Sequence, residues 1–313
     1  MKPTRIIFMG TPEFSVPALK ALAARSDFQI SLVVTQPDRP KGRGKQLAPS
    51  PVKQAAVELG IEVFQPEKLN TDQGVEKLTR LAPDYFVVVA FGQILSQAIL
   101  DIPKIYPINI HASLLPKYRG AAPIQAAVMN MDKESGITTM VMAKGMDTGD
   151  MLVKTRTPID PEDTAQDLHD RLSSMGGEII VNTIDATNAG QVTPKPQDHT
   201  RATHVSMLKK SDGLIDWKKS DKAICAHINA MTPWPGAFTH LAGKRIKIFK
   251  AIPGKGSRDK APGEILCCDK TGIHVAAGDG SIIICELMGS SGKRLTADAF
   301  LRGHSIDLPA RFE

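Results

Sequence analysis

The sequence predicts an α/β fold in which a doubly wound, mostly parallel sheet is followed by a smaller β-barrel domain. In residues 1–189, short apolar runs alternate with helix-length segments, an order that gives a parallel sheet covered by helices on both faces. Residues 190–208 are rich in proline and polar side chains, which is typical of a linker. Residues 209–313 contain one helical segment and then several short strands separated by turn residues, which indicates a small barrel.

The chain opens with a buried strand, a turn and a helix, the first unit of a doubly wound sheet. We expect the strand at 5–9 and the helix at 15–24, with Pro17 in the first helical turn, where proline is tolerated. Of the GxGxxG pattern that binds dinucleotides, only Gly10 is present, so the opening predicts no nicotinamide cofactor.

The remaining elements follow the same patterns. Apolar, β-branched runs predict further strands of the first domain at 30–35, 61–64, 85–90, 105–110, 136–142 and 152–157. The spacing of apolar residues predicts helices at 51–59, 72–81, 123–131, 164–175 and 178–189, the last two separated by Gly176 and Gly177. In the second domain we expect a helix at 220–231 and strands at 238–241, 245–251, 263–268, 272–276 and 281–287. Trp234, which stands between two prolines, is expected to be a packing residue.

Charge is distributed unevenly along the chain. Residues 1–208 contain 22 basic and 22 acidic residues, whereas residues 209–313 contain 17 and 11, so the whole net charge of +6 lies in the last third. A basic domain beside a neutral one fits a polyanionic partner, and it fits equally well a charge that only keeps the protein in solution. The sequence has no run of about 18 apolar residues and no secretory or transit-like N-terminus, so no membrane span is expected.

The cysteines do not predict a metal site or a disulfide framework. Cys225, Cys267, Cys268 and Cys285 lack a paired CxxC spacing and form no metal-binding pattern with the histidines. They are expected to be reduced, buried thiols of a cytosolic protein.

The strand at 105–110 runs into a loop that contains Pro116 and Gly120. Asn109 and His111 stand two residues apart at its end, so they project from one face, at the strand edge where open α/β sheets bind ligands. An imidazole moves protons near neutral pH, and an amide donates a hydrogen bond to a developing oxyanion. On spacing alone, an Asn-x-His at a strand end is more often a structural turn element than a catalytic pair.

Together with a second segment, this stretch resembles the folate-dependent formyltransferases. Their motif reads Asn-x-His-x-Ser-Leu-Leu-Pro, then an aromatic residue, Arg and Gly, and an Asp-Thr-Gly farther along the chain. Here the motif reads Asn109-Ile-His111-Ala-Ser113-Leu114-Leu115-Pro116, followed by Tyr118-Arg119-Gly120 and by Asp147-Thr148-Gly149. The reacting positions show no departure from the pattern, and the resemblance implies a Rossmann-like catalytic domain.

The resemblance implies transfer of a formyl group from 10-formyltetrahydrofolate, the formyl donor, to an amine without a metal. Asn109 would hold the formyl oxygen, His111 would stabilise that oxygen and help to pass the proton, and Asp147 would tune His111 or hold a water that carries the proton. The folate would contact the turn after the strand at 105–110 and the segment after the strand at 85–90. The residues implied are Ser113, Leu114, Leu115, Pro116, Ile94 and Leu95, for which a structural turn and the core are equally good explanations.

Two further features are similar to those of the methionyl-tRNA formyltransferases within this family. The loop 36–51 is long and carries four basic residues among glycines and prolines: Arg39, Lys41, Arg43 and Lys45. The resemblance implies that this loop reaches into the acceptor arm of a tRNA, with Arg43 as its central arginine; a solvated loop is the alternative. The predicted barrel is similar to their oligonucleotide-binding-like (OB-like) C-terminal domain.

The resemblance therefore implies a bacterial cytoplasmic enzyme, expected to be a monomer, that formylates initiator methionyl-tRNA and releases tetrahydrofolate. Two alternatives stay open. One is a formyltransferase that acts on a small amine, such as an amino sugar nucleotide or glycinamide ribonucleotide, because the motif at Asn109 serves the shared folate chemistry. The other is an RNA-binding module on an inactive scaffold, against which the intact Asn109, His111 and Asp147 argue.

Overall fold

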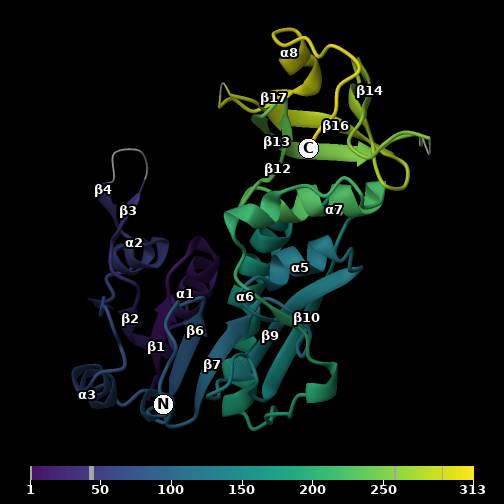
Figure 1. Ribbon diagram of the computed structural model, residues 1–313. Helices are drawn as coiled ribbons and strands as arrows, with labels where there is room; N and C mark the ends of the chain where they lie inside the picture. Colours follow the sequence, from purple (N-terminus) through teal and green to yellow (C-terminus); the bar gives the residue numbers. More distant parts are fainter. Residues whose placement is uncertain (1, 42–45, 257–258, 291) are drawn as a thin grey trace. The chain divides into compact units, whose positions relative to one another are not determined.

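The structure is a computed structural model that describes residues 2–41, 46–256, 259–290 and 292–313 (Figure 1). Backbone contacts divide the chain into two compact units, each assembled from several stretches. The first unit comprises Met1–Gly120, Ser135–Thr157 and His169–His204, and the second comprises Ala121–Glu134, Pro158–Leu168 and Val205–Glu313. The division of the sequence at residues 189 and 208 stays a prediction.

The first unit is organised around a seven-stranded sheet with the order β10-β9-β7-β6-β1-β2-β5. β1 is parallel to β2 and β6, the pairs β2–β5 and β6–β7 are parallel as well, and β9 is antiparallel to β7. This arrangement confirms the predicted mostly parallel, Rossmann-like sheet. The strands are β1 (Thr4–Gly10), β2 (Phe28–Val34), β5 (Val63–Phe64), β6 (Tyr85–Val89), β7 (Tyr106–His111), β9 (Glu134–Val141) and β10 (Met151–Pro158).

The central strands of this sheet are buried. Ile6–Met9 of β1 are fully covered, and all residues of β6 are buried. Continuous apolar strands of this kind are expected where helices cover both faces of a parallel sheet. Because β1, β6 and β7 run in the same direction, their carboxyl ends lie at one edge, and the end of β7 carries Asn109 and His111.

Helices of the first unit begin where the sequence provides caps. The Ser50 hydroxyl accepts a hydrogen bond from the Lys53 amide, and the Thr71 hydroxyl accepts one from the Gly74 amide, which satisfies amides that a helix start leaves unpaired. The helices are α1 (Val16–Ala23), α2 (Pro51–Glu58), α3 (Asp72–Arg80), α4 (Gln97–Leu100) and α6 (Ala165–Asn188), with short 3-10 turns η1 (Glu13–Ser15) and η2 (His199–Arg201).

The prediction of two helices at 164–175 and 178–189 is wrong, because α6 is one continuous helix. Gly176 and Gly177 lie inside it. A Cβ added to Gly177 would approach the Pro17 carbonyl oxygen of α1 to 3.0 Å, and one added to Gly176 would lie 3.5 Å from the Ile110 side chain. Gly177 therefore lets the helix lie close to α1, whereas the distance at Gly176 is an ordinary contact, and sequence spacing does not distinguish such a role from a break.

Part of the basic loop 36–51 forms a pair of short strands. β3 (Arg39–Lys41) and β4 (Gln46–Ala48) form an antiparallel pair. Asp38 precedes it, and its carboxylate accepts hydrogen bonds from Lys53 Nζ at 2.7 Å and from Gln65 Nε2 at 2.7 Å. The hydrogen bonds from Lys53 and Gln65 hold the pKa of Asp38 below its ordinary value. These hydrogen bonds therefore hold the start of the loop, at Asp38, in place.

The second unit contains two packed helices and an antiparallel sheet. α5 (Pro123–Met129) packs against α7 (Asp221–Met231), which is capped by the Ser220 hydroxyl. The sheet has the order β12-β13-β16-β15-β14, with β17 beside β16. Its elements are β12 (Ala237–Leu241), β13 (Lys244–Pro253), β14 (Ile265–Asp269), β15 (Gly272–Ala276), β16 (Ser281–Met288), β17 (Leu295–Thr296) and α8 (Ala297–Leu301), preceded by the 3-10 turn η3 (Lys210–Gly213).

The end of the chain joins the two outer strands of this sheet. Phe312 forms a bridge with Leu241 of β12, and Arg311 forms one with Glu264, immediately before β14. The Phe312 ring is buried and stacks on Trp217 at 5.4 Å between centroids. These bridges close the sheet, in agreement with the predicted small barrel.

Two further observations concern apolar side chains. Trp234 is 51% exposed, so the prediction that it is a packing residue is wrong. Its flanking prolines indicated a constrained turn but carried no information on which side of that turn faces solvent. Within the part of the chain that the structure describes, no helix has the length and apolar character needed to span a membrane.

Candidate functional site

The end of β7 and the loop 142–150 bring three of the predicted site residues together. Asn109 Nδ2 lies 3.4 Å from Asp147 Oδ1, and His111 Nδ1 lies 3.6 Å from Asp147 Oδ2. Because strand residues i and i+2 share a face, β7 directs the amide and the imidazole to the same carboxylate. His111 is 6% exposed, so this pair is shielded from bulk water.

The position of Asp147 depends on an unusual backbone. Its φ of +51° lies in the left-handed region, which Asp tolerates better than most residues. Gly149, two residues on, has no room for a side chain, since a Cβ there would lie 1.7 Å from the Val141 carbonyl oxygen. The Gly120 amide donates a hydrogen bond to Asp147 Oδ2 at 2.7 Å. The Asp-Thr-Gly sequence therefore serves to turn the carboxylate toward β7.

The hydrogen bonds of His111 define which of its nitrogens faces the carboxylate. Nε2 lies 2.9 Å from the Tyr118 carbonyl oxygen, and because a carbonyl only accepts, Nε2 carries a hydrogen. Nδ1 is left to face Asp147. A hydrogen on Nδ1 would be stabilised by that carboxylate, so the imidazole is arranged to hold or release a proton on the Asp147 side.

The predicted folate-contacting turn is well ordered. Ser113 is almost fully buried, and its hydroxyl donates to the Lys117 carbonyl at 2.6 Å. The Thr138 hydroxyl donates to the Ser113 carbonyl at 2.7 Å and accepts from the Leu115 amide at 3.2 Å. Lys154 Nζ donates to the Leu115 carbonyl at 2.5 Å, and burial lowers the pKa of this ammonium group. Of the turn residues, Leu114 and Pro116 remain half-buried.

The two residues predicted after β6 differ in exposure. Leu95 is 5% exposed and packs in the core with Phe86 and Met9, whereas Ile94 is 78% exposed. The segment is tied down by Asn70, whose Nδ2 donates to the Ile94 carbonyl at 2.8 Å. Of this pair, only Ile94 presents its side chain to solvent.

Two buried polar residues that sequence reasoning did not assign hold the Asp147 loop in place. Gln197 Nε2 donates to the carbonyl oxygens of Asp147 and Gly149 at 2.8 and 2.7 Å. Its Oε1 accepts from Nε and Nη2 of Arg119 at 3.1 and 2.8 Å. Gln197 and Arg119 are 4% and 3% exposed. Arg119 stands in the motif itself, but nothing in the sequence indicated Gln197.

The chain around Arg119 is linked to the same stretch as Gln197. Arg119 Nη2 lies 3.0 Å from His199 Nδ1, and the Arg119 amide donates to the Thr203 carbonyl at 2.8 Å. The short strand β8 (Arg119–Gly120) pairs with β11 (His204–Val205). Residues 197–204, which the sequence places in a linker, therefore support the site.

The basic residues of the loop 36–51 are placed only in part. Arg39 is exposed at the start of β3, and Lys41 ends that strand. Arg43 and Lys45 lie outside the described residues.

The site holds one amide donor and one imidazole nitrogen beside a carboxylate. The Asn109 amide nitrogen and His111 Nδ1, at 3.4 and 3.6 Å from the Asp147 carboxylate, are groups of the kind that stabilise a developing oxyanion and move a proton. None of the three residues carries a hydroxyl or a thiol. The arrangement suits acyl transfer by direct attack of an amine.

Comparison with known proteins was made with this geometry in view. A family model described as "Formyl transferase" matches residues 4–184, and one described as "Formyl transferase, C-terminal domain" matches residues 207–305. A methionyl-tRNA formyltransferase of Citrifermentans bemidjiense is 49% identical over 306 residues, which cover 98% of this chain and 95% of that protein. Further proteins of the same name match at 45–51% identity.

Solved structures are similar in fold at lower identity. WlaRD, a sugar 3N-formyl transferase determined in the presence of dTDP and 5-N-formyl-THF, gives a TM-score of 0.64 at 21% identity, over 91% of this chain and 98% of that chain. HypX from Aquifex aeolicus in complex with tetrahydrofolic acid gives 0.62 at 17% identity, over 96% of this chain and 47% of that chain. At these identities the similarity concerns the fold alone.

Proposed function

The chain belongs to the formyl transferase family, and we propose that it transfers the formyl group of 10-formyltetrahydrofolate to the α-amino group of initiator methionyl-tRNA. Its product would be N-formylmethionyl-tRNA for translation initiation in the bacterial cytoplasm. The proposal is supported by 49% identity to a methionyl-tRNA formyltransferase over nearly the whole chain. The sugar-directed enzyme WlaRD is more distant, at 21% identity.

The reaction needs positioning and charge stabilisation more than strong activation. An α-amino group has a reference pKa of about 7.7–8.0, so roughly a tenth or more of it is the neutral nucleophile at pH 7 and little activation is needed. As the amine nitrogen attacks the formyl carbon, negative charge develops on the formyl oxygen, and the bond from the carbon to the folate nitrogen then breaks. The amine loses a proton and the folate nitrogen gains one.

We assign these tasks to the three clustered residues. Asn109 Nδ2 donates to the formyl oxygen, and its present contact with Asp147, at 3.4 Å, is long enough to be exchanged for a better acceptor. His111 acts through Nδ1, since Nε2 donates its hydrogen to the Tyr118 carbonyl. Nδ1 accepts the proton that the amine loses, directly or through a water, and the Nδ1–H so formed donates to the formyl oxygen and passes the proton to the folate nitrogen. Asp147 orients the imidazole and stabilises its charged form.

The residues beside the site fit a folate. The pterin is flat and largely apolar on its faces, and Ile94 and Leu114 offer apolar surface near two strand ends. Ser113, Leu115 and Pro116 support that surface by fixing the turn, with Leu95 beneath Ile94 in the core. Ser113 and Leu115 thus act through the backbone that they order.

The distribution of basic residues fits a tRNA acceptor better than a small amine. The loop 36–51 carries Arg39, Lys41, Arg43 and Lys45, and residues 209–313 hold the whole net positive charge of the chain. Phosphate contacts of this kind bind nucleic acid without reading its sequence. A small amine would leave this charge without a partner.

The single observation that carries the proposal is the 49% identity to a methionyl-tRNA formyltransferase over 98% of the chain, and the Asp147 carboxylate shared by Asn109, His111 and the Gly120 amide agrees with it. The test is formyl transfer from 10-formyltetrahydrofolate to charged initiator methionyl-tRNA, with glycinamide ribonucleotide and an amino sugar nucleotide as rival acceptors. We expect transfer to the tRNA alone, with Arg43→Ala raising the KM for tRNA more than it lowers kcat. Transfer to a small amine and not to the tRNA would overturn the proposal.

A further inference from the structure

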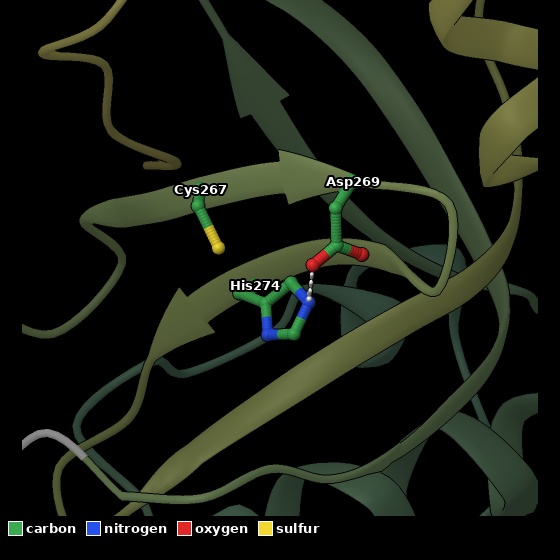
Figure 2. A group of neighbouring side chains, drawn as sticks. All are labelled: Cys267, Asp269 and His274. Carbon is green, nitrogen blue, oxygen red and sulfur yellow. Dashed lines mark ion pairs between the residues drawn. The ribbon is translucent and has the colours of Figure 1, made fainter.

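The hairpin of β14 and β15 gathers three side chains of the types that bind divalent metals, far along the chain from the Asp147 site. Cys267 and His274 are direct cross-strand partners, and Asp269 follows Cys267 by two residues on the same face. One ligand atom of each residue lies within 4.8 Å of those of the other two. Figure 2 shows the thiol, the carboxylate and the imidazole converging on the outer side of the hairpin.

The spacing of these atoms is close to what tetrahedral zinc requires. Zinc binds nitrogen and oxygen at about 2.0–2.2 Å and thiolate sulfur at about 2.3 Å, which separates nitrogen from oxygen by about 3.4 Å and sulfur from either by about 3.6 Å. His274 Nε2 and Asp269 Oδ2 are already 3.1 Å apart. Only the Cys267 thiol, on an exposed side chain, has to approach, and a rotation about one bond moves it.

The hairpin turn holds the carboxylate in place while leaving one oxygen available. Asp269 Oδ1 accepts from the Thr271 amide at 2.7 Å, from its hydroxyl at 2.5 Å and from the Gly272 amide at 3.3 Å. Oδ2 is the oxygen that faces His274.

The cluster is open to solvent. The Asp269 side chain is 50% exposed and the His274 side chain is 21% exposed. A turn that served only to cap the hairpin would explain Asp269, Thr271 and also His274, whose Nε2 lies 3.0 Å from Thr271 Oγ1, but it gives no role to the Cys267 thiol in register with His274.

We propose that Cys267, Asp269 and His274 form a binding site for a zinc-class divalent cation on the second unit, with the fourth position open to water or to an external donor. A thiolate, a carboxylate and a neutral imidazole carry two negative charges, which match the ion. On binding, the thiol releases its proton, and the neutral imidazole keeps its one hydrogen on Nδ1, so that the Nε2 lone pair faces the ion. The site does not depend on the formyl transfer proposed for the first unit.

The test is titration of the full-length, chelator-treated protein with Co²⁺, which accepts the same ligands as zinc and reports a thiolate ligand through an ultraviolet charge-transfer band. We expect one equivalent of Co²⁺ to produce this band and Zn²⁺ to abolish it. Cys267→Ser and His274→Gln should each weaken binding by at least about tenfold, because a lost ligand costs no less than a lost supporting group. The matched control is Cys268→Ser, which removes the neighbouring thiol on the other face and should leave the band unchanged.

The outcomes separate the site from a mere hairpin cap. A band that appears with wild type, disappears with Cys267→Ser and persists with Cys268→Ser supports the proposal. Absence of the band at excess Co²⁺, or a band that Cys267→Ser does not affect, overturns it. Circular dichroism of each variant shows that the loss of binding is not a loss of fold.

Discussion

Gln197 is the residue whose replacement tests the support of the Asp147 loop most directly. Gln197→Leu keeps the size of the side chain but removes its two hydrogen bonds to the carbonyls of Asp147 and Gly149 and its acceptor for Arg119. The carbonyl bonds are worth about 1 kcal/mol each, and the bonds to the guanidinium about 1.5–3 kcal/mol. Because Arg119 keeps His199 as a partner, we expect a loss of about 3–4 kcal/mol in the free energy of unfolding.

The kinetic consequence is larger than the loss of stability suggests. Asp147 has no other side-chain support for its carbonyl among the described contacts, so its carboxylate should drift from His111 and Asn109. A displacement of about 1 Å costs roughly 10²-fold in rate. We expect kcat to fall by about that factor with little change in the KM for tRNA, since the loop 36–51 is untouched.

Two further variants make the test decisive. Gln197→Glu preserves the acceptor for Arg119 but sets a carboxylate oxygen against two carbonyls, so it should lower kcat with a smaller loss of stability. Gln191→Leu is the matched control, because Gln191 is exposed in the same segment. Urea unfolding and steady-state formyl transfer measure both quantities. Wild-type kcat and stability for Gln197→Leu would refute the reasoning.

The remaining predictions concern other groups. Asn109→Ala should lower turnover roughly 10²–10³-fold with an unchanged urea midpoint, by loss of an oxyanion donor; near-normal turnover would remove Asn109 from that role. Gly149→Ala should displace the loop, because its Cβ would lie 1.7 Å from the Val141 carbonyl, and a fully active variant in the same transfer assay would contradict this. Burial raises the pKa of the Cys225 thiol from 9.0 to about 12, so Cys225 should stay unreactive toward a thiol reagent at pH 8 while exposed Cys267 reacts. The raised pKa of Cys225 also stabilises the folded state below about pH 9, and this contribution is lost as the pH rises toward 12. The urea midpoint of the wild type should therefore fall more steeply over this range than that of Cys225→Ser, and equal slopes would contradict the prediction.

The part of the site that could be predicted from sequence is the part that depends on local periodicity. Asn109 and His111 share a face because a strand alternates its side chains, and the structure shows both directed at one carboxylate. Asp147 followed from a family motif, and its left-handed backbone agrees with an Asp-x-Gly turn. Where a strand or a turn sets the geometry within a few residues, the pattern was sufficient.

Contacts between distant parts of the chain were beyond sequence patterns. Gln197 bonds to Arg119 and to the Asp147 carbonyl across 78 and 50 residues, and nothing in a proline-rich stretch distinguishes a supporting glutamine from a solvated one. Gly176 and Gly177 led to a wrong helix prediction for the same reason, since the close approach of Pro17 to Gly177 is a contact between distant parts of the chain. Spacing likewise gave no reason to group Cys267 with His274, because the register of a hairpin brings them together.

The contacts that hold Asp147 predict which replacements of Arg119 the site tolerates. Two contacts hold Asp147 in place. The Gly120 amide donates to its carboxylate, and Gln197 donates to its backbone carbonyl. Gln197 in turn accepts a hydrogen bond from the Arg119 side chain. Arg119 and Gly120 therefore keep the Asp147 loop aligned with the end of β7. An Arg119→Lys change keeps the charge but loses the two-point contact with Gln197 Oε1, so it should not substitute for arginine. We therefore expect Arg119 to affect formyl transfer indirectly, because it holds Gln197 in place.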